Sequence, residues 1–154
     1  MFTIRVYGIL INELQQVLVS DEFIRGNYYT KFPGGGLEIG EGTRTCLRRE
    51  FMEELNLKIA VGDHIYTTDI YQQSAFNPAD QIISIYYFVK ALEPIKVPLK
   101  TLPFDFDEKE LAKYNLTKQI ETFRFIDWQN FSSDAVTLPL DKIVALQLKN
   151  KMNF

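Results

Sequence analysis

The stretch Gly34–Leu57 decides the fold and reads Gly-Gly-Gly-Leu-Glu-Ile-Gly-Glu-Gly-Thr-Arg-Thr-Cys-Leu-Arg-Arg-Glu-Phe-Met-Glu-Glu-Leu-Asn-Leu. Its second half predicts a helix, because no Gly or Pro interrupts residues 44–55. Thr43 is a suitable N-cap, since its hydroxyl can accept a hydrogen bond from the first turn. Asn56 should end the helix, because Asn tolerates the left-handed conformation found after many helices.

This helix should have one apolar stripe and one acidic patch. At about 100° per residue, three side chains share the stripe that should face a core: Leu47, Phe51 and Leu55. Three carboxylates at spacings i, i+3 and i+4 form the patch: Glu50, Glu53 and Glu54. Like charges at these spacings repel, so a positive group should lie among them. Mg²⁺ or Mn²⁺ takes such oxygen ligands, and Glu50 and Glu54, one turn apart, suit that role.

The glycines before the helix should form a loop. In Pro33-Gly34-Gly35-Gly36 the missing Cβ atoms let the backbone pass close to a ligand or ion. The loop can therefore bring carbonyl oxygens to the same cation.

Together these residues resemble the signature of the Nudix hydrolases, G-x5-E-x7-R-E-U-x-E-E-x-G-U, where U is a bulky, usually aliphatic residue. Eight positions are filled in register: Gly35, Glu41, Arg49, Glu50, Phe51, Glu53, Glu54 and Leu57. Asn56 departs from the pattern, which has Gly there. Charged residues on a helix are more often a solvated face. The glycine loop and both acidic pairs in register argue against that reading here.

The resemblance implies an α/β fold, a Nudix-type α/β/α sandwich with a central mixed β-sheet. It also implies a Mg²⁺-dependent (or Mn²⁺-dependent) pyrophosphohydrolase that cleaves the phosphoanhydride of a nucleoside diphosphate linked to another group. The metal ligands would be Glu50, Glu54 and Glu53, with the carbonyl of Gly35 or Gly36. Glu53 would bind through water or polarise the nucleophile, and Arg49 would orient Glu41 and Glu53 by ion pairing.

Other candidate site residues lie outside this stretch. Loops late in the chain of Nudix enzymes often supply an acid that activates water or helps to bind metal. The candidates are Glu108, Glu110 and Glu121, and Glu121 is favoured because it should directly precede a strand at 122–128. Arg25 and Lys31 are candidates for phosphate contacts, with ordinary surface charge as the alternative for both.

Composition limits the class of protein. At 154 residues the chain should form one domain, residues 1–154, with a real core. No apolar run approaches 20 residues and no secretory signal begins the sequence, so we expect no membrane contact. The single cysteine, Cys46, should be a packed helix residue in a reducing, cytoplasmic setting. A net charge of −3 argues against binding of polymeric nucleic acid but not against a nucleotide substrate.

The rest of the chain reads mostly as strands. Residues 3–11 and 16–20 are predicted to form a hairpin, followed by a loop at 21–27 and a short strand at 28–32. Three more strands are predicted: 57–61, 64–74 and 81–91. The last should be central in the sheet, because it is almost continuously apolar. Prolines break the pattern over 93–118, which we expect to be irregular, and a helix is predicted over 138–148.

Substrate choice and the enzyme class leave alternatives open. Four aromatic residues near predicted strand ends could stack on a base, although packing is the commoner role for each: Phe23, Tyr28, Tyr71 and Phe76. The competing class is a non-catalytic Nudix-like sensor or regulatory module that binds a nucleotide. Such proteins usually lose acids from the signature or carry a DNA-binding domain, whereas this chain retains every acid. Dimers are common in the family, so a homodimer is an option.

Overall fold

The structure is a computed structural model that describes residues 1–154, which divide into two compact units. Unit 1 comprises residues 1–12 and 33–97, and unit 2 comprises residues 13–32 and 98–154. Each unit contains a four-stranded sheet with both parallel and antiparallel pairs. The predicted α/β class is therefore confirmed, but two mixed sheets replace the single central sheet that we expected.

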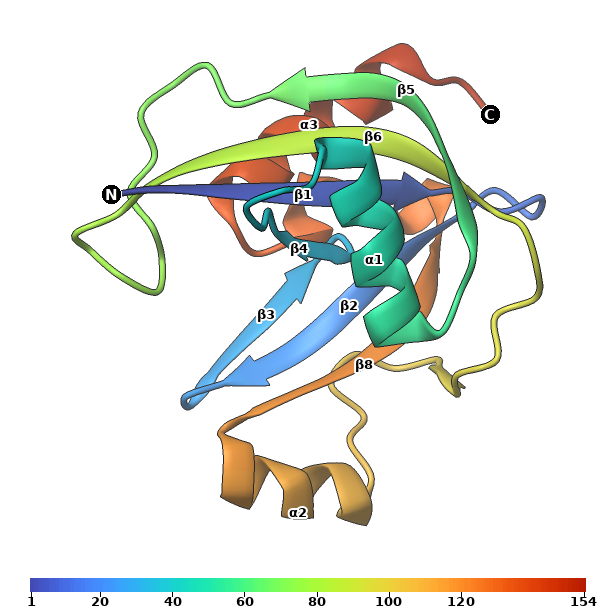
Figure 1. Ribbon diagram of the computed structural model, residues 1–154. Coiled ribbons are helices and arrows are strands. Elements are labelled where there is room, and N and C mark those ends of the chain that lie inside the picture. The colour runs from blue at the N-terminus through green and yellow to red at the C-terminus, as the bar shows by residue number, and fades with distance from the viewer. The chain divides into compact units, whose positions relative to one another are not determined.

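The sheet of unit 1 has the order β4-β1-β6-β5 (Figure 1). Its strands are β1 (Phe2–Leu10), β4 (Gly34–Gly36), β5 (Ile59–Thr67) and β6 (Gln81–Ala91). β1 runs parallel to β6 and antiparallel to β4, so the glycine loop itself forms a short edge strand. β6 lies between two other strands, as its apolar sequence predicted.

β5 corrects the prediction of two strands at 57–61 and 64–74. It is one strand that ends at Thr67, and its pairing with β6 shifts register on both sides of His64. Such a β-bulge leaves residues unpaired on one strand and interrupts the alternation of side chains. The interruption made one bulged strand read as two.

Helix α1 (Thr43–Leu55) packs on β1, β4 and β5 of unit 1 (Figure 1). Its predicted apolar stripe is confirmed, because Leu47, Phe51 and Leu55 are fully buried. The predicted cap is wrong by one residue. Gly42 is the N-cap and makes no side-chain bond, while the Thr43 hydroxyl lies 2.7 Å from that of Tyr87 on β6.

Asn56 ends α1 in the left-handed conformation, with φ 48° and ψ 43°. Its N–H donates to the Met52 carbonyl, and the N–H of Leu57 donates to the Phe51 carbonyl at 3.4 Å. The bond that spans six residues is typical of the Schellman motif, which usually has Gly at this position. Asn56 therefore supplies the backbone geometry of the glycine that the signature specifies.

The sheet of unit 2 has the order β3-β2-β8-β7. Its strands are β2 (Gln16–Ile24), β3 (Asn27–Lys31), β7 (Leu99–Lys100) and β8 (Gln119–Asp127). β2 and β3 form a hairpin whose two-residue turn, Arg25-Gly26, has positive φ at both positions. Such a turn matches the twist of paired strands, so strand β2 continues through most of the predicted loop at 21–27.

The predicted hairpin of residues 3–11 with 16–20 is wrong. β1 pairs with β4 and β6, whereas β2 pairs with β3 and β8. β-branched residues identified both strands correctly, but they do not determine the partners of a strand.

The segment 93–118 contains a helix that the sequence interpretation missed, α2 (Glu108–Thr117). Asp107 caps it and Glu110 reaches back to the Asp107 N–H, a capping box that is visible in the sequence. The chain ends with the short 3-10 helices η1 (Trp128–Asn130) and η2 (Ser133–Ala135) and with α3 (Pro139–Lys151). α3 begins with Pro at its first position, close to the predicted start.

Candidate active site

Arg49 is the centre of a cluster of acids on unit 1, here called the Arg49 cluster: Arg49, Glu38, Glu41, Glu50 and Glu53. Its guanidinium donates to both Glu41 oxygens at 2.9 and 2.6 Å. One further nitrogen, Nη1, lies 2.9 Å from Glu50, 3.2 Å from Glu53 and 3.7 Å from Glu38. The positive group that the acidic patch required is thus supplied in part by the chain itself.

Helix geometry explains how one side chain reaches so many carboxylates. Glu53 follows Arg49 by one turn, and Glu41 lies in the loop before the helix. The planar guanidinium has five donors in a fixed arrangement and can serve several acceptors at once. The predicted ion pairs from Arg49 to Glu41 and Glu53 are present as contacts, while their catalytic meaning stays a prediction.

The ion pairs change the proton affinity of Glu41. Hydrogen bonds from Arg49 lower the pKa of the Glu41 carboxyl to about 2. The same bonds raise the pKa of Arg49. Both groups are therefore ionised at neutral pH.

The acids of α1 differ in exposure. The Glu50 side chain is 12% exposed and that of Glu53 is 59% exposed, while Glu54 is partly buried. Glu50 is thus a fixed group in contact with Arg49, and Glu53 can reach a water molecule or a substrate.

The glycine loop lies directly against these acids. A Cβ atom at Gly35 would overlap the carboxylate of Glu50. A Cβ at Gly34, whose φ is +151°, would overlap the backbone of Val6 and Tyr7 on β1. The Gly36 carbonyl accepts from Arg49 Nη2 at 3.0 Å. The loop backbone therefore lies close to the Glu50 carboxylate, while the predicted approach of the loop to a ligand or ion stays a prediction.

The donor atoms fit a hard divalent cation, although the side chains are not arranged around one. No three Asp, Glu, His or Cys side chains are gathered in a metal-binding arrangement. Oxygen atoms of Glu50, Glu53 and the Gly36 carbonyl nevertheless lie around one guanidinium, that of Arg49, and Mg²⁺ and Mn²⁺ prefer oxygen ligands. The residue set is thus chemically suited to the metal that the signature implies.

Cys46 is buried on α1, as predicted for a packed residue. Burial raises the pKa of its thiol to about 12. Because the reactive species is the thiolate, this cysteine is inert at neutral pH.

A second group of ionisable side chains lies within the sheet of unit 2, here called the Glu22 cluster: Ser20, Glu22, Lys31 and Glu121. We expected Glu121 to directly precede a strand. It instead lies inside β8, opposite Glu22 of β2. The Ser20 hydroxyl lies 3.1 Å from Glu22 and 3.3 Å from Glu121. Burial, followed by the nearby charge of Glu22, raises the pKa of Glu121 to about 7.

The two basic residues predicted to bind phosphate have different surroundings. Arg25 is exposed at the turn between β2 and β3. Lys31 is only 4% exposed, and its ammonium lies 3.1 Å from a Glu22 oxygen. A phosphate would have to compete with the Glu22 carboxylate for Lys31. Glu22 would not compete with it for Arg25.

Sequence interpretation missed a buried ion pair behind the Glu22 cluster. Arg124 binds both oxygens of the fully buried Asp21 at 2.6 and 3.1 Å, and the Thr30 hydroxyl donates to the same carboxylate at 2.7 Å. Alternation along β2 places Asp21 on the opposite face from Ser20 and Glu22. Its position in an apolar strand was the available signal, since a buried acid requires a partner.

The other late acids lie on α2. Glu110 takes part in the capping box and lies 3.6 Å from Lys100, so it has a structural role. Glu108 is exposed in the first turn. Neither belongs to the Glu22 cluster.

Of the four aromatic candidates for base stacking, two pack against other rings and two lie in a loop with exposed side chains. Phe23 stacks on Tyr28 at 4.3 Å and on Tyr114 of α2 at 4.1 Å, so these rings attach α2 to the hairpin. Tyr71 is 64% exposed in the loop after β5. Phe76 is 37% exposed in the same loop.

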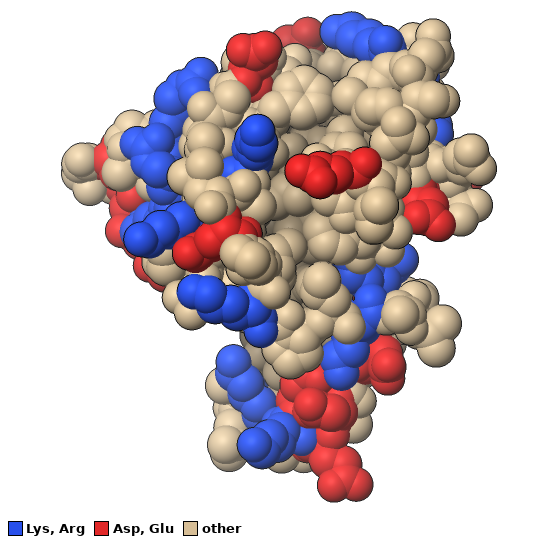
Figure 2. All heavy atoms as spheres, turned by 90° about the vertical axis from the view of Figure 1, so that its right-hand side faces the viewer, with Lys and Arg blue, Asp and Glu red and all other residues tan.

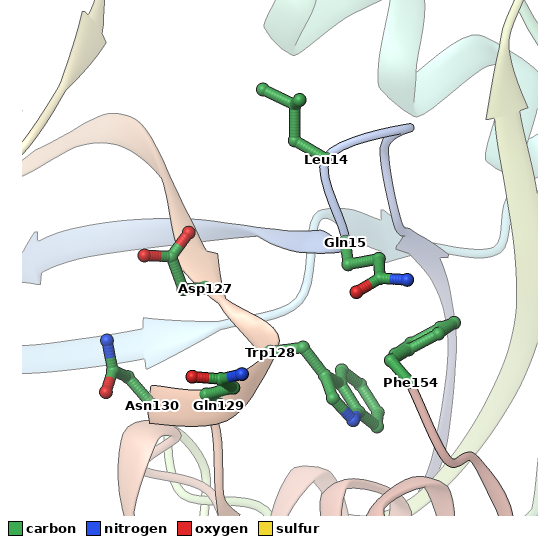
Figure 3. A pocket seen from close by; sticks show the side chains of 7 residues that line it. All are labelled: Leu14, Gln15, Asp127, Trp128, Gln129, Asn130 and Phe154. Atoms are coloured by element: carbon green, nitrogen blue, oxygen red, sulfur yellow. The ribbon is translucent and has the colours of Figure 1, made fainter.

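A pocket of about 240 Å³ lies in unit 2 beside η1 (Figure 3). Trp128 and Phe154 meet edge to face at one side, and the other lining residues are Leu14, Gln15, Asp127, Gln129 and Asn130 (Figure 3). A second pocket, of about 230 Å³, lies near Met1 and Asp80 in unit 1. The first pocket contains none of the predicted site residues, and the second is lined in part by Tyr71, one of the aromatic candidates for base stacking.

The charge distribution and the helix lengths bear on partners. Figure 2 shows both acidic and basic side chains on one face of the molecule. None of the helices combines the length and the apolar character needed to cross a membrane.

Comparison with known proteins identifies the family. Residues 1–136 match the NUDIX domain. No curated protein sequence matches the chain. Among solved structures, a MutT protein from Methanosarcina mazei Go1 superposes with a TM-score of 0.66 at 14% identity, covering 98% of this chain and 96% of that one. A MutT NUDIX hydrolase from Burkholderia pseudomallei gives 0.65 at 11% identity, with 99% of both chains covered.

A UDP-X diphosphatase structure matches more partially. Its TM-score is 0.61 at 15% identity, over 98% of this chain and 64% of that one. At such identities the similarity is one of fold, and it confirms the predicted Nudix-type α/β architecture.

Proposed function

The chain belongs to the NUDIX domain family, the family of the Nudix pyrophosphohydrolases, and we propose that it hydrolyses the phosphoanhydride of a nucleoside diphosphate linked to another group. The observation that carries this proposal is the Arg49 cluster. It joins the acids of the signature to the glycine loop in one connected set of contacts. A solvated acidic helix face would not need a shared guanidinium or the contact of Gly35 with Glu50.

The proposed metal is Mg²⁺ or Mn²⁺, held by Glu50, Glu54 and Glu53 with the carbonyl of Gly35 or Gly36. When bound, it would neutralise charge on the diphosphate oxygens and lower the pKa of a bound water. The Gly36 carbonyl accepts from Arg49 Nη2, and Gly35 is paired with Val6 of β1, so either carbonyl would serve the metal in addition to its present partner.

The chain's own residues have separate roles in this proposal. Arg49 holds Glu41, Glu50 and Glu53 in place through charge-assisted hydrogen bonds. Glu53, which is exposed, orients the water that attacks one phosphorus atom while the bridging P–O bond breaks. Glu121 is the candidate base that takes the proton of this water, and its raised pKa suits proton transfer near neutral pH. Arg25 contacts the phosphate groups of the substrate, as does Lys31 if it exchanges Glu22 for phosphate.

The remaining proposals concern the setting of the protein. The buried thiol of Cys46 suits a reducing, cytoplasmic compartment. One domain over residues 1–154 is consistent with a family match that extends across segments of both units. A homodimer is tested by light scattering on the purified protein.

A panel of substrates tests the proposal. It contains nucleoside triphosphates, ADP-ribose, UDP-sugars and dinucleoside polyphosphates. One solved structure of similar fold is a UDP-X diphosphatase and another is an ADP-ribose pyrophosphatase, so both substrate classes belong in it. We expect at least one class to yield a nucleoside monophosphate, seen by ion-exchange chromatography, only when Mg²⁺ or Mn²⁺ is present.

The competing function is a sensor that binds a nucleotide without cleaving it. The intact set of signature acids favours the enzyme, because non-catalytic Nudix-like modules usually lose acids from the signature. Nucleotide binding in a thermal-shift assay without cleavage of any panel member would favour the sensor instead.

A further inference from the structure

Glu22 and Glu121 face each other directly across two strands. They are register partners in the antiparallel pair of β2 and β8, so both side chains lie on one face of the sheet. Directly opposed residues have Cβ atoms about 5 Å apart, and like charges at this separation are destabilising. Glu22 is 7% exposed and Glu121 is partly buried, so water screens their repulsion poorly.

The Ser20 hydroxyl lies between the two carboxyl groups. Its oxygen is 3.1 Å from Glu22 Oε2 and 3.3 Å from Glu121 Oε2. A hydroxyl has one hydrogen and can donate to only one of them. Both contacts become hydrogen bonds when Glu121 carries a proton and donates to Ser20, which then donates to Glu22.

Charge balance assigns the proton to the same residue. The Lys31 ammonium is 3.1 Å from Glu22 Oε1, and both side chains are buried, so the Glu22 carboxylate is the ion-pair partner of Lys31. One ammonium cannot neutralise two carboxylates. The remaining charge near Glu121 is Lys113 on α2, which attracts it more weakly than Lys31 does.

We infer that Glu22 is a positioning residue for Glu121: its carboxylate, paired with Lys31, acts through the Ser20 hydroxyl to keep the proton of the buried acid pair on Glu121. This inference rests on the proposed function in one respect, the role of Glu121 as the base. The raised pKa of Glu121 agrees with it, since burial and the charge of Glu22 are its two largest causes. Activity that depends on ionised Glu121 then increases as the pH rises through about 7.

Carboxyl ¹³C NMR of glutamate-labelled protein tests the inference without any substrate. The Glu121 resonance is assigned by its loss in Glu121→Gln. In the wild type we expect it to titrate near neutral pH, and in Glu22→Gln at least one pH unit lower, because the opposed charge is gone. The control is Glu13→Gln, which removes an exposed carboxylate of unit 2 and should leave the titration unchanged.

Glu22→Gln leaves the Lys31 ammonium without its carboxylate and can unfold the sheet. The double variant Glu22→Gln/Lys31→Gln removes both members of the ion pair. We expect it to lower the pH at which Glu121 titrates, by less than Glu22→Gln alone does. Wild-type titration of Glu121 near its ordinary value, or equal titration in the wild type and the folded double variant, would overturn the inference.

The pH profile of kcat/KM separates this inference from the proposed function. If Glu121 is the base, the acidic limb should move in Glu22→Gln by the shift that NMR measures. If NMR shows the shift in the Glu121 titration but the acidic limb of kcat/KM does not move, the role of Glu22 is supported and Glu121 is not the base of the proposed mechanism.

Discussion

The Arg49 cluster and the Glu22 cluster both gather several carboxylates around one cation, with opposite results. Arg49 serves its acids through several nitrogens and lowers the pKa of Glu41, whereas the single ammonium of Lys31 serves Glu22 and the pKa of Glu121 rises. Two differences account for this. The guanidinium donates in several directions at once, and the acids around Lys31 lie in a sheet interior where the charged form is disfavoured. In these two clusters the pKa of a carboxyl group thus depends on the donors that reach it, on its burial and on the charge of a neighbouring acid.

The largest effect should come from two acids of α1, Glu53 and Glu54. In the proposed mechanism, Glu53→Gln and Glu54→Gln each remove a charge from the diphosphate site while conserving shape. We expect turnover to fall about 10²- to 10⁴-fold with the fold intact. Steady-state kinetics on the substrate identified in the panel, with circular dichroism, measures this. Near-normal turnover of both variants contradicts the site, and Glu13→Gln is the control.

Arg49→Lys asks whether donor geometry is what distinguishes the two clusters. It retains the charge but has one nitrogen, so it cannot bind Glu41 with two bonds and also reach Glu50 and Glu53. We expect a loss of about 1–3 kcal/mol in the free energy of unfolding, measured with urea, and a large loss of turnover. The neighbouring exposed Arg48→Lys is the matched control. Equal stability of the two variants would show that charge alone suffices at Arg49.

Gly35→Ala tests the contact between the glycine loop and the acids. The added Cβ would displace the Glu50 carboxylate, so we expect turnover to fall about 10- to 100-fold. Gly42→Ala is the control, because a Cβ at Gly42 meets no atom within 4 Å. If both variants retain activity, the position of Glu50 does not depend on the loop.

The smallest effects concern the pH dependence of folding stability. As the pH rises, the Glu41 carboxyl should increase stability and the Glu121 carboxyl should decrease it. The pKa of Glu41 is lowered, so its stabilising contribution is present above about 4.5, its ordinary value, and is lost as the pH falls towards 2. The pKa of Glu121 is raised from 4.5 to about 7, so the protonated folded form is favoured and stability falls as the pH rises between these values.

Glu121→Gln removes this ionisation. We expect the variant to gain about 1–3 kcal/mol relative to the wild type between pH 5 and pH 8, as measured by urea unfolding at each pH. A difference that does not change with pH would contradict the raised pKa of Glu121.

The sequence by itself determined the elements whose signals are local. Helix α1, its apolar stripe and its left-handed end at Asn56 depend on residues close together in the chain, as do the glycine loop and the register of the signature. The capping box of Asp107 and Glu110 was equally local and could have predicted α2. Short-range hydrogen bonds and helical periodicity explain why these features are readable.

Only the tertiary structure decided which strands pair and what each acid faces. β1 and β2 belong to different sheets, and Glu121 faces Glu22 because β8 pairs with β2 in one register out of many. Strand partners and burial depend on contacts between residues far apart in the chain, and a shift of one residue would turn Glu121 to the other face. The sequence therefore identified the acids, and the pairing of β8 with β2 determined that Glu121 faces Glu22 and has a raised pKa.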